Sequence, residues 1–508
     1  MRLEASIKNT FSAITMQLVA MLIGLILPRL YLSNFGSEVN GLVSSITQFI
    51  AYLTLVEAGL ASATTTTLYL PLAEDNHNRV NAILAAAKKF YFHIGYIFSG
   101  LVLCLALIYP SVIKTNSLTN IEMGILVLVL GFNGAFDFFT LSRYRALLTA
   151  DQRYYIVANA STLASIINFF LVVLTMNLDC SVVVVRTVAL TSFILRSLLL
   201  NIYVRRNYKY VDYSVTPDYK ALNKRWDAMI LQLLGLAQNS LPVVMLTFFS
   251  NLKVVSVYSI YNMVAASILS ILASITNGFS ASFGDMIAKK ETEVLQKTYI
   301  QYELLFFMLM IWAYSCMNIL YLSFIRIYTA GIHDVNYLQP LVAFLFVLNG
   351  LAYSFKTPAG TLIGSAGVFK ETKPSTMIQT AIAIGLSLLL TPFWGIVGVL
   401  IALIISNLYR DIDLVIFMSK NVTKLPCRQS FIRILNSILI FGITNLPFHF
   451  LVIDTGGFGQ WFLTAIGVAL WSMVVVITYN LIADREVLLQ ILRRLNGSKV
   501  KLYRRRKP

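Results

Sequence analysis

The sequence predicts an all-α polytopic membrane protein with about fourteen transmembrane helices. Apolar stretches of roughly 18–25 residues follow one another along the chain, and each is long enough to cross a bilayer as a helix. Only 12% of the 508 residues are charged, whereas a soluble domain carries about 25%. A helix satisfies its backbone hydrogen bonds within one segment, which hydrocarbon requires.

The apolar stretches are joined by short polar links. The expected spans cover residues 11–33, 42–71, 91–111, 122–146, 157–177, 182–204, 227–250, 255–283, 303–325, 338–366, 374–392, 395–417, 431–452 and 461–483. The longest polar link between spans, 205–226, separates an N-terminal six-helix lobe, 1–204, from a C-terminal six-helix lobe, 227–417. Two additional helices are expected in 418–483, and a basic tail, 484–508, follows them.

The positive charge is distributed as topology requires. Lys and Arg gather in alternate links, which the positive-inside rule assigns to the cytoplasm. With both termini inside, about 33 of the 40 Lys and Arg are cytoplasmic and about four are outside. We therefore predict a multi-pass protein of the cytoplasmic membrane, and we take the net charge of +17 as a topology signal rather than a nucleic-acid footprint. The tail residues Arg504–Lys507 could also touch anionic lipid.

An internal repeat relates the two lobes. A shift of 216 residues places Asn133 and Gly134 on Asn349 and Gly350, and a shift of 217 places Ser33–Asn34 on Ser250–Asn251. Because each copy has six spans, both copies have the same orientation, related by a pseudo-twofold axis along the membrane normal. Such lobes suit alternating access to a central site. A duplication in a static channel or membrane enzyme is the alternative.

Charged residues within the spans are the candidate site. A charge at mid-membrane costs about 2.5–3.5 kcal/mol, so it usually faces a wet cavity or pairs internally. These residues are Glu57, Asp137, Arg186, Arg196 and Lys356, with Arg143 and Arg145 near the inner end of span 122–146.

Lys356 is the first candidate for substrate contact, because the repeat maps it onto Thr140, in the polar stripe of Asp137, Thr140 and Tyr144. An ion pair of Lys356 with Asp137 or Glu57, or snorkelling toward an interface, stays open.

Alternative roles also stay open for Glu57 and for the two arginines of the span 182–204. Arg186 and Arg196 are separated by roughly 80° around their helix, so they cannot share one tight site, although both could line a cavity. Arg196 could instead snorkel to the cytoplasm. Glu57 could bind a proton or sodium ion, or neutralise an arginine. The surplus of cations favours a negatively charged cargo, since arginine grips phosphate with two hydrogen bonds.

Catalytic motifs were not found. The sequence holds no GxxxxGK[ST] phosphate loop and no CxxC or HxxxH metal spacing, so we expect no enzyme activity, cofactor or metal. Asp411 and Asp413 resemble the acidic pair of some glycosyltransferases, but they are interpreted as a helix-end charge cluster. The outside links of about 4–12 residues argue against a membrane glycosyltransferase or polymerase. An assembly scaffold remains a third class.

Several segments resemble the polysaccharide transporter family of the multidrug/oligosaccharidyl-lipid/polysaccharide exporter (MOP) superfamily, the O-antigen or capsule repeat-unit flippases. The resemblance covers the whole chain and includes the opening helix 9–32, ending LPRLYL, the run FGSEVNGLVSSITQFIAYLTLVEAGLASA at 35–63 and LLTADQRYY at 147–155. It implies a bacterial flippase for a polyprenyl-pyrophosphate-linked oligosaccharide, working by alternating access with a basic cavity. Carried over, the cavity cations are Lys356, Arg186, Arg196 and Arg143, and Glu57 and Asp137 serve coupling or ion pairing.

The resemblance also implies partners. Coupling to H+, to Na+ or to the membrane potential is expected, and polysaccharide polymerase and glycosyltransferases are candidate partners. A lipid II flippase or a drug/cation antiporter of the same superfamily is the alternative function. The antiporter form usually stops at twelve helices and has a more acidic cavity.

Overall fold

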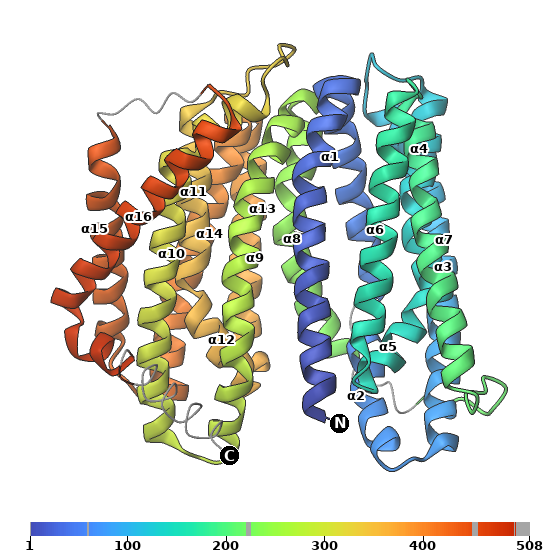
Figure 1. The fold of residues 1–508 in the computed structure, drawn as a ribbon, viewed down its shortest axis with the longest axis horizontal. Coiled ribbons are helices and arrows are strands. Elements are labelled where there is room, and N and C mark those ends of the chain that lie inside the picture. The colour runs from blue at the N-terminus through green and yellow to red at the C-terminus, as the bar shows by residue number, and fades with distance from the viewer. Residues whose placement is uncertain (1, 58–59, 220–224, 450–455, 492, 494–508) are drawn as a thin grey trace. The chain divides into compact units, whose positions relative to one another are not determined.

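The computed structural model of the protein describes residues 2–57, 60–219, 225–449, 456–491 and 493 (Figure 1). Over these residues the chain forms helices joined by short links, and no strand occurs among them. Eleven of these helices are long and apolar enough to cross a membrane. The expectation of an all-α polytopic membrane protein is therefore confirmed. The basic tail 494–508 lies outside the described residues.

Further helical segments of the length of a span accompany these eleven candidates. The first candidate span, Lys8–Glu57, lies mostly in α1 (Arg2–Leu53), which Gly36 divides into two helices through its φ of 77°. Only glycine adopts that conformation readily. Two further helices have the length of a span: α8 (Arg225–Phe249) and α14 (Ile396–Met418). Every 18-residue stretch of α14 includes three charged residues, Arg410, Asp411 and Asp413, so this helix is not among the eleven.

The chain forms two compact units, Met1–Ser259 and Ile260–Pro508. The N-terminal unit contains α1, α8 and six further whole helices: α2 (Leu60–Ala73), α3 (His77–Val112), α4 (Asn120–Phe136), α5 (Ser142–Ala150), α6 (Tyr154–Asn177) and α7 (Val182–Asn207). It also contains the beginning of α9 (Leu252–Ala288). The C-terminal unit contains the rest of α9 and the whole of α14. Its other helices are α10 (Thr292–Tyr328), α11 (Pro340–Phe355), α12 (Thr357–Ala366), α13 (Phe369–Trp394), α15 (Cys427–His449) and α16 (Phe458–Ala483). These units have other boundaries than the predicted lobes, 1–204 and 227–417, which were defined by the sequence repeat. The lobes stay a prediction.

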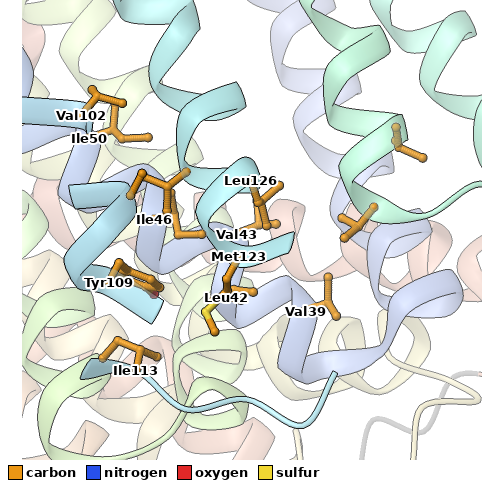
Figure 2. Packing of buried hydrophobic residues seen from close by; sticks show 14 of the residues in the cluster. Val39, Leu42, Val43, Ile46, Ile50, Val102, Tyr109, Ile113, Met123 and Leu126 are labelled. Atoms are coloured by element: carbon orange, nitrogen blue, oxygen red, sulfur yellow. The ribbon is translucent and has the colours of Figure 1, made fainter. Parts of the chain in front are cut away.

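An apolar core joins α1, α3 and α4 in the N-terminal unit (Figure 2). The second half of α1 presents residues at helical spacing, so they share one face. They are Val39, Leu42, Val43, Ile46 and Ile50, and they pack with Val102 and Tyr109 of α3 and with Met123 and Leu126 of α4. In a bilayer such packing gains van der Waals contact rather than release from water.

The internal repeat is visible in the helix ends. α3 ends at Val112 and α10 at Tyr328, and α5 ends at Ala150 and α12 at Ala366. Both pairs are separated by the 216 residues found in the sequence.

The same offset also recurs in the packing inside each unit. A Cβ on Gly134 would lie 2.7 Å from the Phe98 ring, and a Cβ on Gly350 would lie 2.3 Å from the Tyr314 ring. Phe98 and Tyr314 are themselves 216 residues apart, so each copy packs an aromatic ring against a glycine of the neighbouring helix.

A buried ion pair joins the last two helices to α10. The Arg433 guanidinium of α15 donates to Glu303 of α10 at 2.9 Å and to Asp484, just after α16, at 3.2 Å. Ser430 and Tyr299 donate to the same Glu303 carboxylate. The Arg433 and Glu303 side chains are each only 3% exposed, so the pair is shielded from solvent.

We predict that Arg433→Met lowers the stability of the detergent-solubilised protein by about 3–5 kcal/mol, because it leaves the Glu303 charge buried without its partner. Adding Glu303→Gln to Arg433→Met should restore part of the loss, since glutamine needs no counter-charge. Thermal melting followed by size-exclusion chromatography measures both effects. A melting temperature unchanged by Arg433→Met would show that the pair does not stabilise these helices.

Two backbones meet closely within the N-terminal unit. A Cβ on Gly41 of α1 would lie 1.7 Å from the Leu252 carbonyl oxygen at the start of α9. Beside it, the Asn40 amide donates to Ser256 Oγ at 2.8 Å. This hydrogen bond joins residues 216 positions apart in the sequence, so it holds α1 and α9 together where their backbones meet. Small residues permit such close helix contacts in membranes.

We predict that Gly41→Ala destabilises the protein by about 1–3 kcal/mol, because the added methyl group forces α1 and α9 apart. Gly24→Ala is the matched control, since Gly24 lies in the first half of α1 and its Cβ would meet nothing within 4 Å. Melting temperatures of the two variants test this. Equal melting temperatures would contradict the close contact.

Candidate functional site

A helix break positions the charged residues of the N-terminal unit. α4 ends at Phe136, and Asp137–Leu141 form a π-helical turn before α5 begins at Ser142. We expected Asp137, Thr140 and Tyr144 to form one stripe on a continuous α-helix, and this is wrong. The π turn takes an extra residue and rotates the next helical turns about the axis. Tyr144 is consequently buried, and its hydroxyl donates to Asn201 of α7 at 3.0 Å.

Four side chains form what we call the N-terminal charge cluster: Glu57, Asp137, Arg145 and Arg196. Arg196 Nη2 donates to Asp137 Oδ1 at 3.1 Å, and Arg145 Nη2 lies 3.5 Å from Asp137 Oδ2 and 3.7 Å from Glu57 Oε1. Glu57 ends the short 3₁₀ turn Thr54–Glu57, which follows α1. Arg145 therefore joins two carboxylates, and the cluster as a whole is neutral.

The remaining two arginines of the predicted site lie on aromatic rings. The Arg186 guanidinium carbon is 4.1 Å from the centre of the Tyr31 ring. Arg143 contacts the rings of Tyr144 and Tyr213, at 4.8 and 5.1 Å. The Nε atoms of both arginines are buried without an acceptor, and neither has a carboxylate within 4 Å in the described part of the chain.

In the C-terminal unit, Lys356 stands at the break between α11 and α12. Pro358 follows two residues later, and proline removes a backbone donor at such a break. Lys356 Nζ donates to Asn407 Oδ1 at 2.6 Å and lies 4.5 Å from the centre of the Tyr353 ring. Asn407 also accepts from Gln379 at 3.1 Å and donates to Asn349 at 3.1 Å. An amide network thus holds the lysine.

Acidic groups of α14 lie beside this network. Asp411 follows Asn407 by one helical turn, and it interacts electrostatically with Lys356. Its two carboxylate oxygens are buried and accept no hydrogen bond from the described residues. Arg410, in contrast, donates to Asp413 at 2.7 Å and to Thr376 at 2.8 Å. The expected helix-end cluster is thus an Arg410–Asp413 pair, and Asp411 belongs with Lys356.

The predicted site residues therefore fall into separate groups. Asp137 and Arg196 pair directly, Glu57 reaches them through Arg145, and Arg143 and Arg186 each lie on tyrosine. Lys356 has its partners in the C-terminal unit. Sequence reasoning named Arg145 among the charged residues but gave it no role, and it did not assign Gln379, Asn407 or Asp411 to the site. The available signal was the spacing of Asn407 and Asp411, which puts two polar side chains on one face of an apolar helix.

The N-terminal unit also contains a cavity of about 770 Å³. Its polar lining is Glu57, Lys88, Lys89 and His93, and most of the remaining wall is aromatic or aliphatic. Such a mixture suits a ligand with a polar head and an apolar body. Among the described residues no three His, Cys, Asp or Glu side chains come together to hold a metal ion.

Comparisons with known proteins identify the fold. No protein-family model and no curated protein matches the chain. Among solved structures, a lipid II flippase MurJ in an inward closed conformation aligns with a TM-score of 0.67 at 14% identity, covering 96% of this chain and 100% of that one. An inward-facing multidrug resistance MATE family transporter of the MOP superfamily aligns with a TM-score of 0.65 at 14% identity, covering 84% and 99%.

A third structure extends the comparison. A MOP superfamily transporter from Pyrococcus furiosus, described by a reverse polarity of its binding pocket that suggests a different function, aligns with a TM-score of 0.58 at 15% identity, covering 85% and 96%. The chain thus has the fold of MOP superfamily transporters. These neighbours are transporters rather than enzymes, in agreement with the expectation from the sequence.

We predict that Asp137→Asn destabilises the protein more than Glu57→Gln. Asp137 accepts a 3.1 Å hydrogen bond from Arg196, and charged hydrogen bonds are worth about 1.5–3 kcal/mol. Glu57 is 3.7 Å from an arginine whose side chain is 39% exposed, so its pairing is worth less than about 1 kcal/mol. Melting temperatures of the two variants give the order, and a reversed order would contradict this account of the cluster.

Proposed function

We propose that the protein is a flippase that moves a polyprenyl-pyrophosphate-linked oligosaccharide from the inner to the outer leaflet by alternating access. The observation that carries this proposal is the charge at membrane depth in the N-terminal unit. Four arginines, Arg143, Arg145, Arg186 and Arg196, accompany only two carboxylates, Glu57 and Asp137. An anionic cargo balances such a surplus, whereas a cationic drug increases it.

The physical task fits the charge. A pyrophosphate sugar head has no partners in hydrocarbon, so crossing the bilayer needs a polar path. Arginine supplies forked donors for phosphate, and lysine supplies a point charge. The polyprenyl tail can remain in lipid throughout. Coupling to H+ or Na+ through Glu57 or Asp137, and a location in the bacterial cytoplasmic membrane with both termini inside, belong to the same proposal.

A lipid II flippase is the second candidate. The observation that favours it is the length of the match, because MurJ covers 96% of this chain and the MATE transporter covers 84%. Lipid II carries the same polyprenyl-pyrophosphate group, so the charge argument supports both cargos. A drug/cation antiporter agrees less well with the surplus of arginines. Partnership with a polysaccharide polymerase and glycosyltransferases applies to the first candidate only.

We predict that Lys356→Ala abolishes translocation while the protein remains folded, because the lysine supplies a cation at the helix break of the C-terminal unit. The measurement uses proteoliposomes with three fluorescent probes: a polyprenyl-pyrophosphate oligosaccharide, lipid II and a cationic dye. Chemical quenching from outside reports which probe changes leaflet. Lys370→Ala is the matched control, since that lysine is exposed and lies near the start of α13.

The outcomes separate the candidates. Translocation of the oligosaccharide probe with loss in Lys356→Ala, but not in Lys370→Ala, supports the first candidate, and preference for lipid II supports the second. Equal rates in Lys356→Ala and the unmodified protein would remove Lys356 from the mechanism. Movement of the cationic dye alone would refute a flippase.

A further inference from the structure

The segment after α7 lies along the first turns of α3. The Tyr210 ring stacks on the His77 ring with centres 3.9 Å apart, and the Asn81 amide donates to the Tyr210 carbonyl at 2.8 Å. Further along, the Asp218 N–H donates to the Ala82 carbonyl at 3.1 Å. These contacts fix residues 208–219 of the predicted cytoplasmic linker against the N-terminal unit.

Two cations contact the ring of Tyr213 in this segment. Lys88 Nζ of α3 is 5.0 Å from the centre of the Tyr213 ring, and the Arg143 guanidinium carbon of α5 is 5.1 Å from it. Arg143 also donates to the Tyr144 hydroxyl at 3.1 Å. Cations are attracted to the faces of aromatic rings, but more weakly than to an anion. Neither Lys88 nor Arg143 has a carboxylate within 4 Å among the described residues.

The Tyr213 ring does not supply the missing negative charge. Burial raises the pKa of Tyr213 to about 12, although the nearby Arg143 acts in the opposite direction. At neutral pH the hydroxyl is therefore protonated, and its oxygen is buried without a hydrogen-bond partner. Two cations thus face one neutral ring, and Arg143 Nε still has no acceptor.

The 770 Å³ cavity opens beside this arrangement. Lys88 and Tyr213 both line it, and so do Lys89 and His93. Phe90, Phe92, Ile94 and Ile97 give it an apolar wall. Glu57 lines it as well and would repel an anion, but Arg145 offsets this charge at 3.7 Å.

We infer that Lys88 and Arg143 form a binding site for the phosphate-bearing head of an amphiphile, and that Tyr213 fills this site when it is empty of ligand. The phosphate would replace the ring between the two cations, with the Arg143 guanidinium as a forked donor and Lys88 as a point charge. The apolar wall of the cavity would take the first part of the chain. This inference rests on the proposed function, and it names where the cargo is first held.

Binding to the purified full-length protein in detergent tests the inference, with geranyl pyrophosphate as the probe and titration calorimetry as the measurement. Lys88→Gln and Arg143→Gln should each weaken binding at least tenfold. Tyr213→Ala should tighten it severalfold, because the ring no longer competes for the site. Tyr213→Phe should leave the affinity unchanged, since the hydroxyl has no partner to lose.

Two controls protect the result. Arg79→Gln removes one exposed cation from the same end of α3 and should change the affinity less than twofold. Arg143→Lys keeps the charge but loses the forked donor, and an intermediate affinity is expected even if Arg143→Gln folds poorly. Melting temperatures of all variants establish that they are folded.

The source of the phosphate is resolved by a second probe, dihexanoyl phosphatidylglycerol. Stronger binding of geranyl pyrophosphate assigns the site to the pyrophosphate cargo, and equal or stronger binding of the phospholipid assigns it to a membrane lipid head group. Equal affinity of the unmodified protein, Lys88→Gln and Arg143→Gln for both probes would overturn the site. Weaker binding by Tyr213→Ala would overturn the role of the ring.

The proposed function can fail separately. If the protein translocates the lipid-linked oligosaccharide but its Lys88 and Arg143 variants bind geranyl pyrophosphate normally, the proposed binding site is refuted and the flippase function is not. If the protein binds geranyl pyrophosphate through these residues but moves no lipid-linked probe between leaflets, the flippase function is refuted and the binding site is not.

Discussion

The cost of an ionised side chain at membrane depth governs how this protein is built. Hydrocarbon offers no partner to a charge, so each charged group within a span needs one from the protein. Among the described residues, Asp137 has two arginines, Lys356 has the Asn407 amide, and Arg186 lies on the Tyr31 ring. These partners lie inside one unit in every case. The charge arrangement of each unit can therefore be understood from that unit alone.

The helix break occurs in both copies of the repeat, but the two breaks carry side chains of opposite charge. In the first copy, α4 is followed by the π turn Asp137–Leu141, and in the second copy α11 is followed by Lys356. Residues 140 and 356 are equivalent under the 216-residue shift. Both breaks interrupt an apolar helix and free its backbone groups, which makes a polar side chain acceptable there. One break carries a carboxylate and the other an ammonium group, although the helices that follow the two breaks, α5 and α12, end at equivalent residues.

The fold was largely predictable because its causes are local. Apolar length and the periodic placement of Lys and Arg indicate helices and their order, and the repeat appears as matched pairs such as Gly134 and Gly350. The site was less predictable because partners come from distant segments. Arg145 joins Glu57 across 88 positions, and Asn407 reaches Lys356 across 51. The π turn was missed because one additional residue in a turn leaves no clear mark on hydropathy.

The arginines of the N-terminal unit differ in their ability to bind an anion. Arg145 and Arg196 are engaged with carboxylates, so a phosphate that recruited them would leave Glu57 or Asp137 without a partner. Removing one partner of such a pair costs more than the pair itself gains. Arg143 exchanges the Tyr213 ring for a phosphate, and a cation is attracted more strongly to an anion than to a neutral ring. The paired arginines therefore serve the architecture of the unit, and the binding capacity lies with the cations that have no carboxylate.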